Sequence, residues 1–568
     1  MTDYVRKRYS LWMDSPYVDE ETKTALAALR EDEKALEDSF YQSLTFGTAG
    51  LRGILGPGDN RMNLYTVRRA TFGLAAYLSS LSAESSVAIA YDSRNCSALF
   101  ARETARVLAA AGIQIYLYST LRSVPQLSFA VLEKKCTAGV VITASHNPPE
   151  YNGYKVYWSH GGQVGPEQAD AIFACIQAQP DFADVSLSYQ QAVADGKIRL
   201  LGEETDELYY QKVETLVSDP EKLKAHGGEV SIVYTPLHGT GYVPVTSILK
   251  RIGITNCYTV PEQSLPDGDF PTVAAPNPEF KEAFTLGIAL AEKKQADLVL
   301  ATDPDADRLG VAVKTDAGDW NVLTGNQIGA LLLHSVLTNR RAAGKLSKNG
   351  LMVRSMVSTH LADVIARDFG LEVKEVLTGF RFISEQIDLC EKTGKHTFEF
   401  GFEESNGYLA GTFCRDKDSI SAAVLLAETA VYAHLEGKTL YDRLTEIYNT
   451  YGWFGEVGFS FTLAGKEGIE KIGRVMENLR CNPPACVGAD AVTAVLDYRD
   501  TEKTGLPKSN VLAYTLSSGS TLIVRPSGTE PKLKLYMLCR ADSREALEQS
   551  KQTLTEDAKA LLNTRFDA

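Results

Sequence analysis

A serine and a histidine, Ser145 and His146, stand side by side directly after an apolar run. The run at 138–142 is rich in valine and isoleucine, which is typical of a buried strand, and Pro148 and Pro149 cannot continue a strand or a helix. Open α/β sheets hold their sites in loops at the carboxyl ends of strands. The hydroxyl of Ser145 could therefore act as a nucleophile, although an ordinary serine turn beside a surface histidine has the same short pattern.

Three aspartates, Asp303, Asp305 and Asp307, follow a second apolar run at alternate positions. In an extended segment alternate side chains point to one side, so these carboxylates can form a hard oxygen cage for a divalent cation. The segment continues into Arg-Leu-Gly-Val and lacks the glycine and distal glutamate of an EF-hand loop. A solvated acidic turn is the alternative, but clustered carboxylates after an apolar strand are costly without a cation. The pattern predicts a metal site.

Several cations follow strands or glycines and could bind an anion. Arg52 lies among three glycines at 46–53, Lys155 is close to the serine along the chain, and Arg381 follows the strand pattern at 371–376. A lysine with a pKa lowered by burial could also transfer a proton. A solvated arginine in a glycine-rich turn and an exposed lysine on a strand edge are the alternatives.

Two further loops suit a phosphorylated sugar. Glu403, Glu404, Ser405 and Asn406 lie between glycines, and carboxylates accept paired hydrogen bonds from vicinal hydroxyls. The segment R-P-S-G-T-E-P-K at 525–532 combines an arginine, hydroxyls and a glycine-permitted turn, which can cradle a phosphate. Its spacing excludes a nucleotide P-loop, while a plain hairpin remains possible.

Strand and helix patterns alternate along most of the chain, and alternation of this kind indicates mostly parallel sheets covered by helices. Length alone suggests three or four domains. The final stretch, from about residue 450, differs in composition and contains alternating strand patterns. We expect an α/β protein of four domains, with boundaries at 1–204, 205–322, 323–447 and 448–568.

The composition is that of an ordinary globular protein, with 568 residues, 44% of them hydrophobic and 23% charged. The net charge of −14 and the lack of a long basic run argue against nucleic acid and anionic membranes as partners. Nine scattered cysteines without a C-x-x-C pair fit reduced thiols. No apolar leader or 18-residue apolar segment occurs, so we expect a cytoplasmic protein, and no obligate protein partner is evident.

Four motifs occur in a fixed order: T-A-S-H-N-P, D-P-D-A-D-R, F-E-E-S-N-G and R-P-S-G-T-E-P-K. On these motifs the chain resembles the α-D-phosphohexomutases, the phosphoglucomutase/phosphomannomutase family. The opening F-G-T-A-G-L-R-G resembles the branch of bacterial phosphoglucomutases and phosphopentomutase-like enzymes. The resemblance implies three related mixed-sheet α/β domains and a smaller α+β C-terminal domain around a central cleft.

The resemblance also implies a role for each candidate residue. Ser145 would be the phosphoserine, and its oxygen with Asp303, Asp305 and Asp307 would bind Mg²⁺. The catalytic centre and the substrate phosphate sites would comprise Arg52, His146, Asn147, Lys155, Arg308 and Arg381. Glu403 and Ser405 would bind sugar hydroxyls, with Thr378 and Gly379 in the loop that distinguishes the two sugar orientations. The non-transferred phosphate would be held by Arg525, Ser527, Gly528 and Thr529.

The implied reaction is the interconversion of glucose 1-phosphate and glucose 6-phosphate, with glucose 1,6-bisphosphate as primer. Phosphoryl transfer needs in-line positioning and neutralised oxygens, which a metal and several cations supply. The expected partner is a small phosphosugar. A phosphopentomutase acting on ribose or deoxyribose phosphate and a phosphomannomutase remain open. Outside the mutases, a phosphosugar-binding regulator and a metal-dependent phosphatase are the alternatives.

Overall fold

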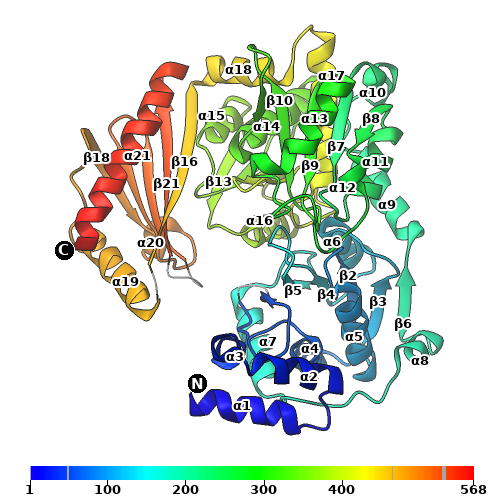
Figure 1. Ribbon diagram of the computed structural model, residues 1–568. Helices are drawn as coiled ribbons and strands as arrows, with labels where there is room; N and C mark the ends of the chain where they lie inside the picture. The colour runs from blue at the N-terminus through cyan, green and yellow to red at the C-terminus, as the bar shows by residue number, and fades with distance from the viewer. Residues whose placement is uncertain (1, 48–49, 464, 528–531, 568) are drawn as a thin grey trace. The chain divides into compact units, whose positions relative to one another are not determined.

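The computed structural model describes residues 2–47, 50–463, 465–527 and 532–567. The chain divides into two compact units. The first comprises residues 1–324, 384–394 and 405–437, and the second comprises 325–383, 395–404 and 438–568. Figure 1 labels their helices and strands.

The first unit contains a six-stranded mixed sheet in the order β1-β5-β4-β2-β3-β6. The strands are β1 (Gly50–Ile54), β2 (Ser86–Tyr91), β3 (Gln114–Tyr118), β4 (Ala138–Ile142), β5 (Tyr151–Trp158) and β6 (Ile198–Leu201). The helices around them are α4 (Leu64–Leu81), α5 (Ser97–Ala110), α6 (Val124–Glu133), α7 (Pro166–Gln177) and α8 (Tyr189–Ala194). Strands β4, β2, β3 and β6 are parallel, whereas β5 runs antiparallel to both β4 and β1.

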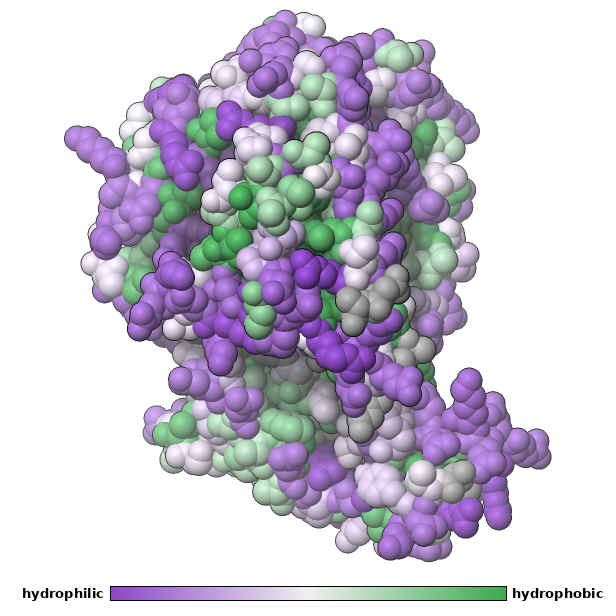
Figure 2. Space-filling view, turned by 90° about the vertical axis from the view of Figure 1, so that its left-hand side faces the viewer, coloured by the Kyte–Doolittle hydropathy of each residue, from purple (hydrophilic) through white to green (hydrophobic). Residues whose placement is uncertain are grey.

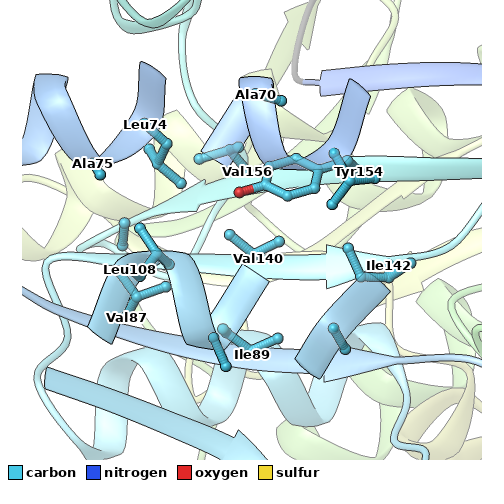
Figure 3. Close-up of a cluster of buried hydrophobic side chains, with 14 of the residues drawn as sticks. Ala70, Leu74, Ala75, Val87, Ile89, Leu108, Val140, Ile142, Tyr154 and Val156 are labelled. Carbon is cyan, nitrogen blue, oxygen red and sulfur yellow. The ribbon is translucent and has the colours of Figure 1, made fainter. Parts of the chain in front are cut away.

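Both faces of this sheet are covered, which explains why β4 is a continuous apolar strand with every residue buried. Helices α4, α5 and α7 pack on one face and α6 on the other. Figure 3 shows part of the first core, with Val140 and Ile142 of β4 lying between α4, which carries Leu74, and α5, which carries Leu108. Figure 1 shows α6 on one side of the labelled strands of this sheet and α4, α5 and α7 on the other.

Three short helices precede the first sheet: α1 (Asp3–Asp14), α2 (Glu20–Leu29) and α3 (Glu33–Phe40). Side-chain caps from Thr2, Asp19 and Asp32 accept the first free backbone N–H groups of these helices. Trp12 and Phe40 are buried between them.

A second sheet in the first unit has the order β11-β10-β9-β7-β8. Its strands are β7 (Ser231–Thr235), β8 (Asn256–Thr259), β9 (Leu298–Thr302), β10 (Leu309–Lys314) and β11 (Trp320–Val322). The helices are α9 (Glu203–Glu214), α10 (Pro220–His226), α11 (Tyr242–Arg251), α12 (Pro261–Ser264) and α13 (Thr285–Lys294), and later in the chain α17 (Ser419–Leu435), which follows the short strand β15 (Gly407–Leu409). Helix α17 packs against α11.

The second unit begins with an α/β part, in which β13 and β14 both pair in parallel with β12. The strands are β12 (Gly350–Ser355), β13 (Glu372–Val376) and β14 (Thr397–Glu403), and the helices are α14 (Gly325–Ala342), α15 (Leu361–Asp368) and α18 (Leu440–Tyr451). Helix α16 (Phe380–Thr393) begins in this unit, and its residues from 384 on belong to the first unit. Helix α16 begins at Phe380, so Arg381 lies in its first turn and not in the expected loop.

The C-terminal part of the second unit is a sheet in the order β16-β21-β20-β19-β18-β17, in which the pairs are antiparallel. The strands are β16 (Trp453–Thr462), β17 (Cys486–Val487), β18 (Asp490–Asp497), β19 (Leu512–Leu516), β20 (Thr521–Pro526) and β21 (Lys532–Ala541). The helices are α19 (Gly465–Cys481), α20 (Thr501–Thr504) and α21 (Arg544–Asp567). Helices α19 and α21 share one core with the sheet.

Hydrophilic residues cover most of the face shown in Figure 2, and hydrophobic residues appear between them in separate groups. The exposed large hydrophobic side chains are scattered along the sequence, from Tyr4 to Val495. Among the described helices, none is both long and apolar enough to cross a membrane.

Candidate active site

Ser145 follows β4 by three residues, and its backbone is in the left-handed region with φ 52°. A non-glycine residue in that region costs about 1–3 kcal/mol, so its surroundings must hold it there. The backbone N–H of Ser145 donates to Thr143 Oγ1 at 2.8 Å. Thr143 Oγ1 donates to the Asp92 carboxylate at 2.6 Å. The loop that follows β2 therefore supports the serine loop.

The three aspartates follow β9 and lie against the serine. Their carboxylates are buried, and one ligand atom of each lies within 4.8 Å of the others. The Ser145 hydroxyl donates to Asp303 Oδ2 at 2.6 Å. The two loops, which are 158 residues apart in sequence, therefore form one cluster of oxygen atoms.

The aspartate cluster fits a divalent cation. Asp305 Oδ1 and Asp307 Oδ1 are buried and accept no hydrogen bond from any described residue. Burial, with Asp305 and Asp307 nearby, raises the pKa of Asp303 well above its ordinary value, and burial and Asp305 raise the pKa of Asp307. Burial also disfavours ionisation of Asp305, but Lys155, a hydrogen bond with Asp303 and the charge of Lys417 together lower the pKa of Asp305. Buried, unpaired carboxylate oxygens of this kind fit a divalent cation.

Cations surround this cluster. Lys155 Nζ lies 3.1 Å from Asp305 Oδ2, and the Arg308 guanidinium lies 3.9 Å from Asp307 Oδ1 while it also pairs with Glu279. Arg52 on β1 donates to Asn147 Oδ1 at 3.1 Å. The structure thus brings the predicted cations of the first unit to the serine loop and the aspartate loop.

His146 lies beside the serine, with Nδ1 3.2 Å from Ser145 Oγ. Burial, with the positive charges of Arg308 and Arg52, lowers the pKa of His146 well below its ordinary value. The imidazole is therefore neutral at pH 7, and it can accept or donate a hydrogen bond at the serine hydroxyl.

Lys417 is a cation of this site that sequence reasoning passed over. Its Nζ lies 3.0 Å from Asp307 Oδ2 and 2.9 Å from Asp416 Oδ1. Asp416 also accepts a hydrogen bond from the Tyr157 hydroxyl at 2.6 Å. The segment Asp416-Lys417-Asp418 before a helix was the available signal, but only the fold shows that the 405–437 segment returns to the first unit.

The turn at 235–241 supports the aspartate loop. Thr240 donates to the Pro304 carbonyl from both N–H and Oγ1, at 2.8 and 2.9 Å. A Cβ added at Gly239 would lie 2.4 Å from Pro304 Cα. Glycine is required there because the two loops approach backbone to backbone.

In the second unit, Gly379 and Glu403 are in contact. The Gly379 N–H donates to Glu403 Oε1 at 2.6 Å, and Gly379 has φ 116°. Thr378 precedes it in the loop after β13, and the Arg381 guanidinium lies 4.6 Å from the Phe382 ring centroid. The hydrogen bond between Gly379 and Glu403 therefore connects this loop to the acidic loop at the end of β14, where we expect the sugar to bind.

Ser405, by contrast, belongs to the first unit. The next residue, Asn406, has φ 63°, and it exchanges hydrogen bonds with the backbone of Leu309 at the start of β10. Asn406 is thus hydrogen-bonded to Leu309, which lies two residues after the last of the three aspartates.

The C-terminal loop contributes Arg525 on β20 and Ser527 just after it. Arg525 pairs in register with Lys534 of β21, so two cations face each other on neighbouring strands beside the loop. The predicted Gly528 and Thr529 lie outside the described residues.

A buried hydroxyl against three carboxylates, with cations around them, is the arrangement of a phosphoryl-transfer enzyme. Family models bear this out along the chain: phosphoglucomutase/phosphomannomutase α/β/α domains I, II and III match residues 43–181, 207–318 and 324–451, and the C-terminal domain matches 476–556. The chain belongs to the phosphoglucomutase/phosphomannomutase family, and the expected α-D-phosphohexomutase fold and isomerase class are confirmed.

Individual relatives agree with this placement. The phosphoglucomutase of Staphylococcus aureus strain MRSA252 is 38% identical over 512 residues, covering 88% of this chain and 90% of that one. The phosphoglucomutase of Staphylococcus saprophyticus is 37% identical over 530 residues, covering 91% and 94%. The open form of parafusin, a phosphoglucomutase from Paramecium, shares the fold with a TM-score of 0.70 and 17% identity, covering 91% and 96%.

Proposed function

We propose that this chain is a phosphoglucomutase, which interconverts glucose 1-phosphate and glucose 6-phosphate through a phosphoserine and a glucose 1,6-bisphosphate intermediate. The observation that carries the proposal is the 2.6 Å hydrogen bond from Ser145 Oγ to Asp303, inside a buried cluster with unpaired carboxylate oxygens. The staphylococcal relatives bear the same name. Free bisphosphate acts as the primer that phosphorylates Ser145.

Mg²⁺ is the proposed cation, held by Asp303, Asp305, Asp307 and the Ser145 oxygen, and it supplies positive charge to the phosphoryl oxygens. Lys155 and Arg52 add positive charge beside the cluster and the serine loop, and they orient the phosphoryl group. Neutral His146 contacts the serine hydroxyl through Nδ1 at 3.2 Å. These residues position the serine for in-line transfer rather than providing unusual covalent chemistry.

The remaining residues bind the sugar phosphate. We propose that Glu403 and Ser405 accept hydrogen bonds from sugar hydroxyls, and that Thr378 and Gly379 distinguish the two orientations of the ring. The phosphate contacts are assigned to Asn147, Arg308, Arg381, Arg525, Ser527, Gly528 and Thr529. The hydrogen bond between Gly379 and Glu403 supports this grouping, because it holds the Glu403 carboxylate beside the loop that contains Thr378 and Gly379.

The reaction has two transfers. Phospho-Ser145 donates its phosphoryl group to the 6-hydroxyl of glucose 1-phosphate, the bisphosphate turns over, and Ser145 then takes the 1-phosphate.

We also propose domain boundaries at 204/205, 322/323 and 447/448, and a cytoplasmic location, which the nine free cysteines support.

A coupled assay tests the proposal. With Mg²⁺ and catalytic glucose 1,6-bisphosphate, kcat/KM is compared for glucose 1-phosphate, mannose 1-phosphate and ribose 1-phosphate. A clear lead for glucose 1-phosphate is expected. A lead for mannose or ribose phosphate would keep the site assignment and change the substrate, and release of free phosphate faster than isomerisation would indicate a phosphatase.

A further inference from the structure

Arg94, on the loop after β2, is buried under the serine loop with only 3% of its surface exposed. Its guanidinium donates to four backbone carbonyls of that loop. Nη2 donates to Ser145 O at 2.5 Å and to Asn147 O, and Nη1 donates to Pro148 O at 2.8 Å and to Tyr151 O at 3.1 Å. A single side chain therefore fixes the backbone on both sides of the two prolines.

The terminal nitrogens of the guanidinium donate to carbonyls, and its Nε forms a buried ion pair with Asp92 Oδ2 at 3.5 Å. This Nε has no hydrogen-bond partner among the described residues. Burying a charged guanidinium costs free energy of desolvation, and a hydrophobic side chain would fill the same space at lower cost. The arrangement makes sense if the conformation of that loop matters to the reaction.

Residues in the segment that follows α12 also contact Arg94 and its neighbour Asn95. The guanidinium carbon lies 4.9 Å from the ring centroid of Phe270, which is fully buried and has φ 46°. Next to it, Asn95 donates to Asp269 at 2.7 Å. The guanidinium thus has its face on an aromatic ring and its edge on the serine loop, a geometry that arginine can adopt and lysine cannot.

We propose that Arg94 is a positioning residue for phosphoryl transfer, which locks the 145–151 backbone so that Ser145 Oγ meets the aspartate cluster. The inference rests on the proposed function and concerns a residue outside its substrate and metal contacts. The left-handed backbone of Ser145 is the strained feature that Arg94 maintains.

The test compares Arg94→Lys with a matched control, Arg102→Lys. Arg102 is exposed on α5, the helix that follows the same loop, and its guanidinium lies 5.9 Å from the Tyr189 ring. Since a small misplacement of a reacting atom costs about 100-fold in rate, Arg94→Lys should lower kcat by about that factor, with KM for glucose 1-phosphate changed less than about threefold. Arg102→Lys should leave both constants unchanged.

Phe270→Leu provides a second variant, because it removes the ring and keeps the arginine. It should lower kcat by about tenfold with KM unchanged, since the guanidinium loses the surface that orients it. Melting temperatures are measured alongside. If Arg94→Lys is unfolded at the assay temperature, Phe270→Leu decides, and an unchanged kcat in that variant contradicts the proposal.

A folded Arg94→Lys protein with wild-type kcat would overturn the inference, as would a loss confined to KM. These outcomes differ from failure of the proposed function, in which the wild-type protein itself would not isomerise glucose 1-phosphate.

Discussion

Asp303 occupies an environment that is costly without a cation. It is buried, it lies beside two other carboxylates, and its pKa is raised by burial and by those neighbours. Asp303→Asn should therefore stabilise the metal-free protein, because a buried amide needs neither a charge nor the uptake of a proton, while an acceptor oxygen remains. The same change should abolish the rise in melting temperature on adding Mg²⁺.

Differential scanning fluorimetry with and without Mg²⁺ measures both effects. The control is Asp316→Asn, an exposed aspartate in the turn after β10, which should leave both melting temperatures unchanged. A wild-type response to Mg²⁺ in Asp303→Asn would contradict the assigned metal site.

Histidines that are at least partly buried predict how stability depends on pH. Besides that of His146, burial lowers the pKa of four imidazoles below their ordinary value of 6.5, those of His160, His238, His334 and His360. Below pH 6.5 the unfolded chain binds protons that the folded chain does not, so the free energy of unfolding falls as pH decreases through that region and levels off above it.

Urea unfolding between pH 5.5 and 7.5 checks this slope. His238→Gln should flatten it, because His238 is buried and its Nε2 lies 2.9 Å from Thr272 Oγ1. One lowered pKa unit corresponds to about 1.4 kcal/mol. A stability that increases on acidification over this range would contradict the direction.

Among the elements, the 235–241 turn holds the aspartate loop in place. Gly239→Ala would put a Cβ 2.4 Å from Pro304 Cα, and since both sides are backbone, the aspartate loop must shift. We expect weaker Mg²⁺ binding by about tenfold, as for outer contacts of metal ligands. Isothermal titration calorimetry measures it.

Gly473→Ala is the matched control. Gly473 lies in α19, and an added Cβ meets no atom within 4 Å, so alanine should be neutral or stabilise by up to about 1 kcal/mol. Equal Mg²⁺ affinity in Gly239→Ala and the wild-type protein would contradict the proposed support of the aspartate loop by the 235–241 turn.

The sequence was informative where local pattern and chemistry coincide. The strand at 138–142 and the alternate aspartates could be read directly, since a buried apolar strand must end in a loop and clustered carboxylates need a cation. Arg94 and Lys417 could not, because their partners lie 51 and more residues away and only the fold brings them together. The start of α16 at Phe380 was missed because a glycine and a strand end indicated a loop.

At the scale of the whole molecule, the unexpected feature is the segment 405–437. It lies late in the sequence, within the predicted third domain, yet it belongs to the first unit. It returns to the first unit, where α17 packs on α11 and Lys417 meets Asp307. Ser419 Oγ also donates to the Ala306 carbonyl at 2.5 Å. A stretch late in the chain thus completes the site formed by the first two sheets.

The central claim is that Ser145 carries the phosphoryl group, and mapping the phosphate tests it most directly. The Mg²⁺-loaded protein is incubated with glucose 1,6-bisphosphate, digested and analysed by tandem mass spectrometry, with a chase by glucose 1-phosphate. We predict phosphate on Ser145, its transfer to sugar during the chase, and neither phosphate nor turnover in a folded Ser145→Ala protein. Phosphate on another residue, with mutase activity kept in Ser145→Ala, would contradict the account.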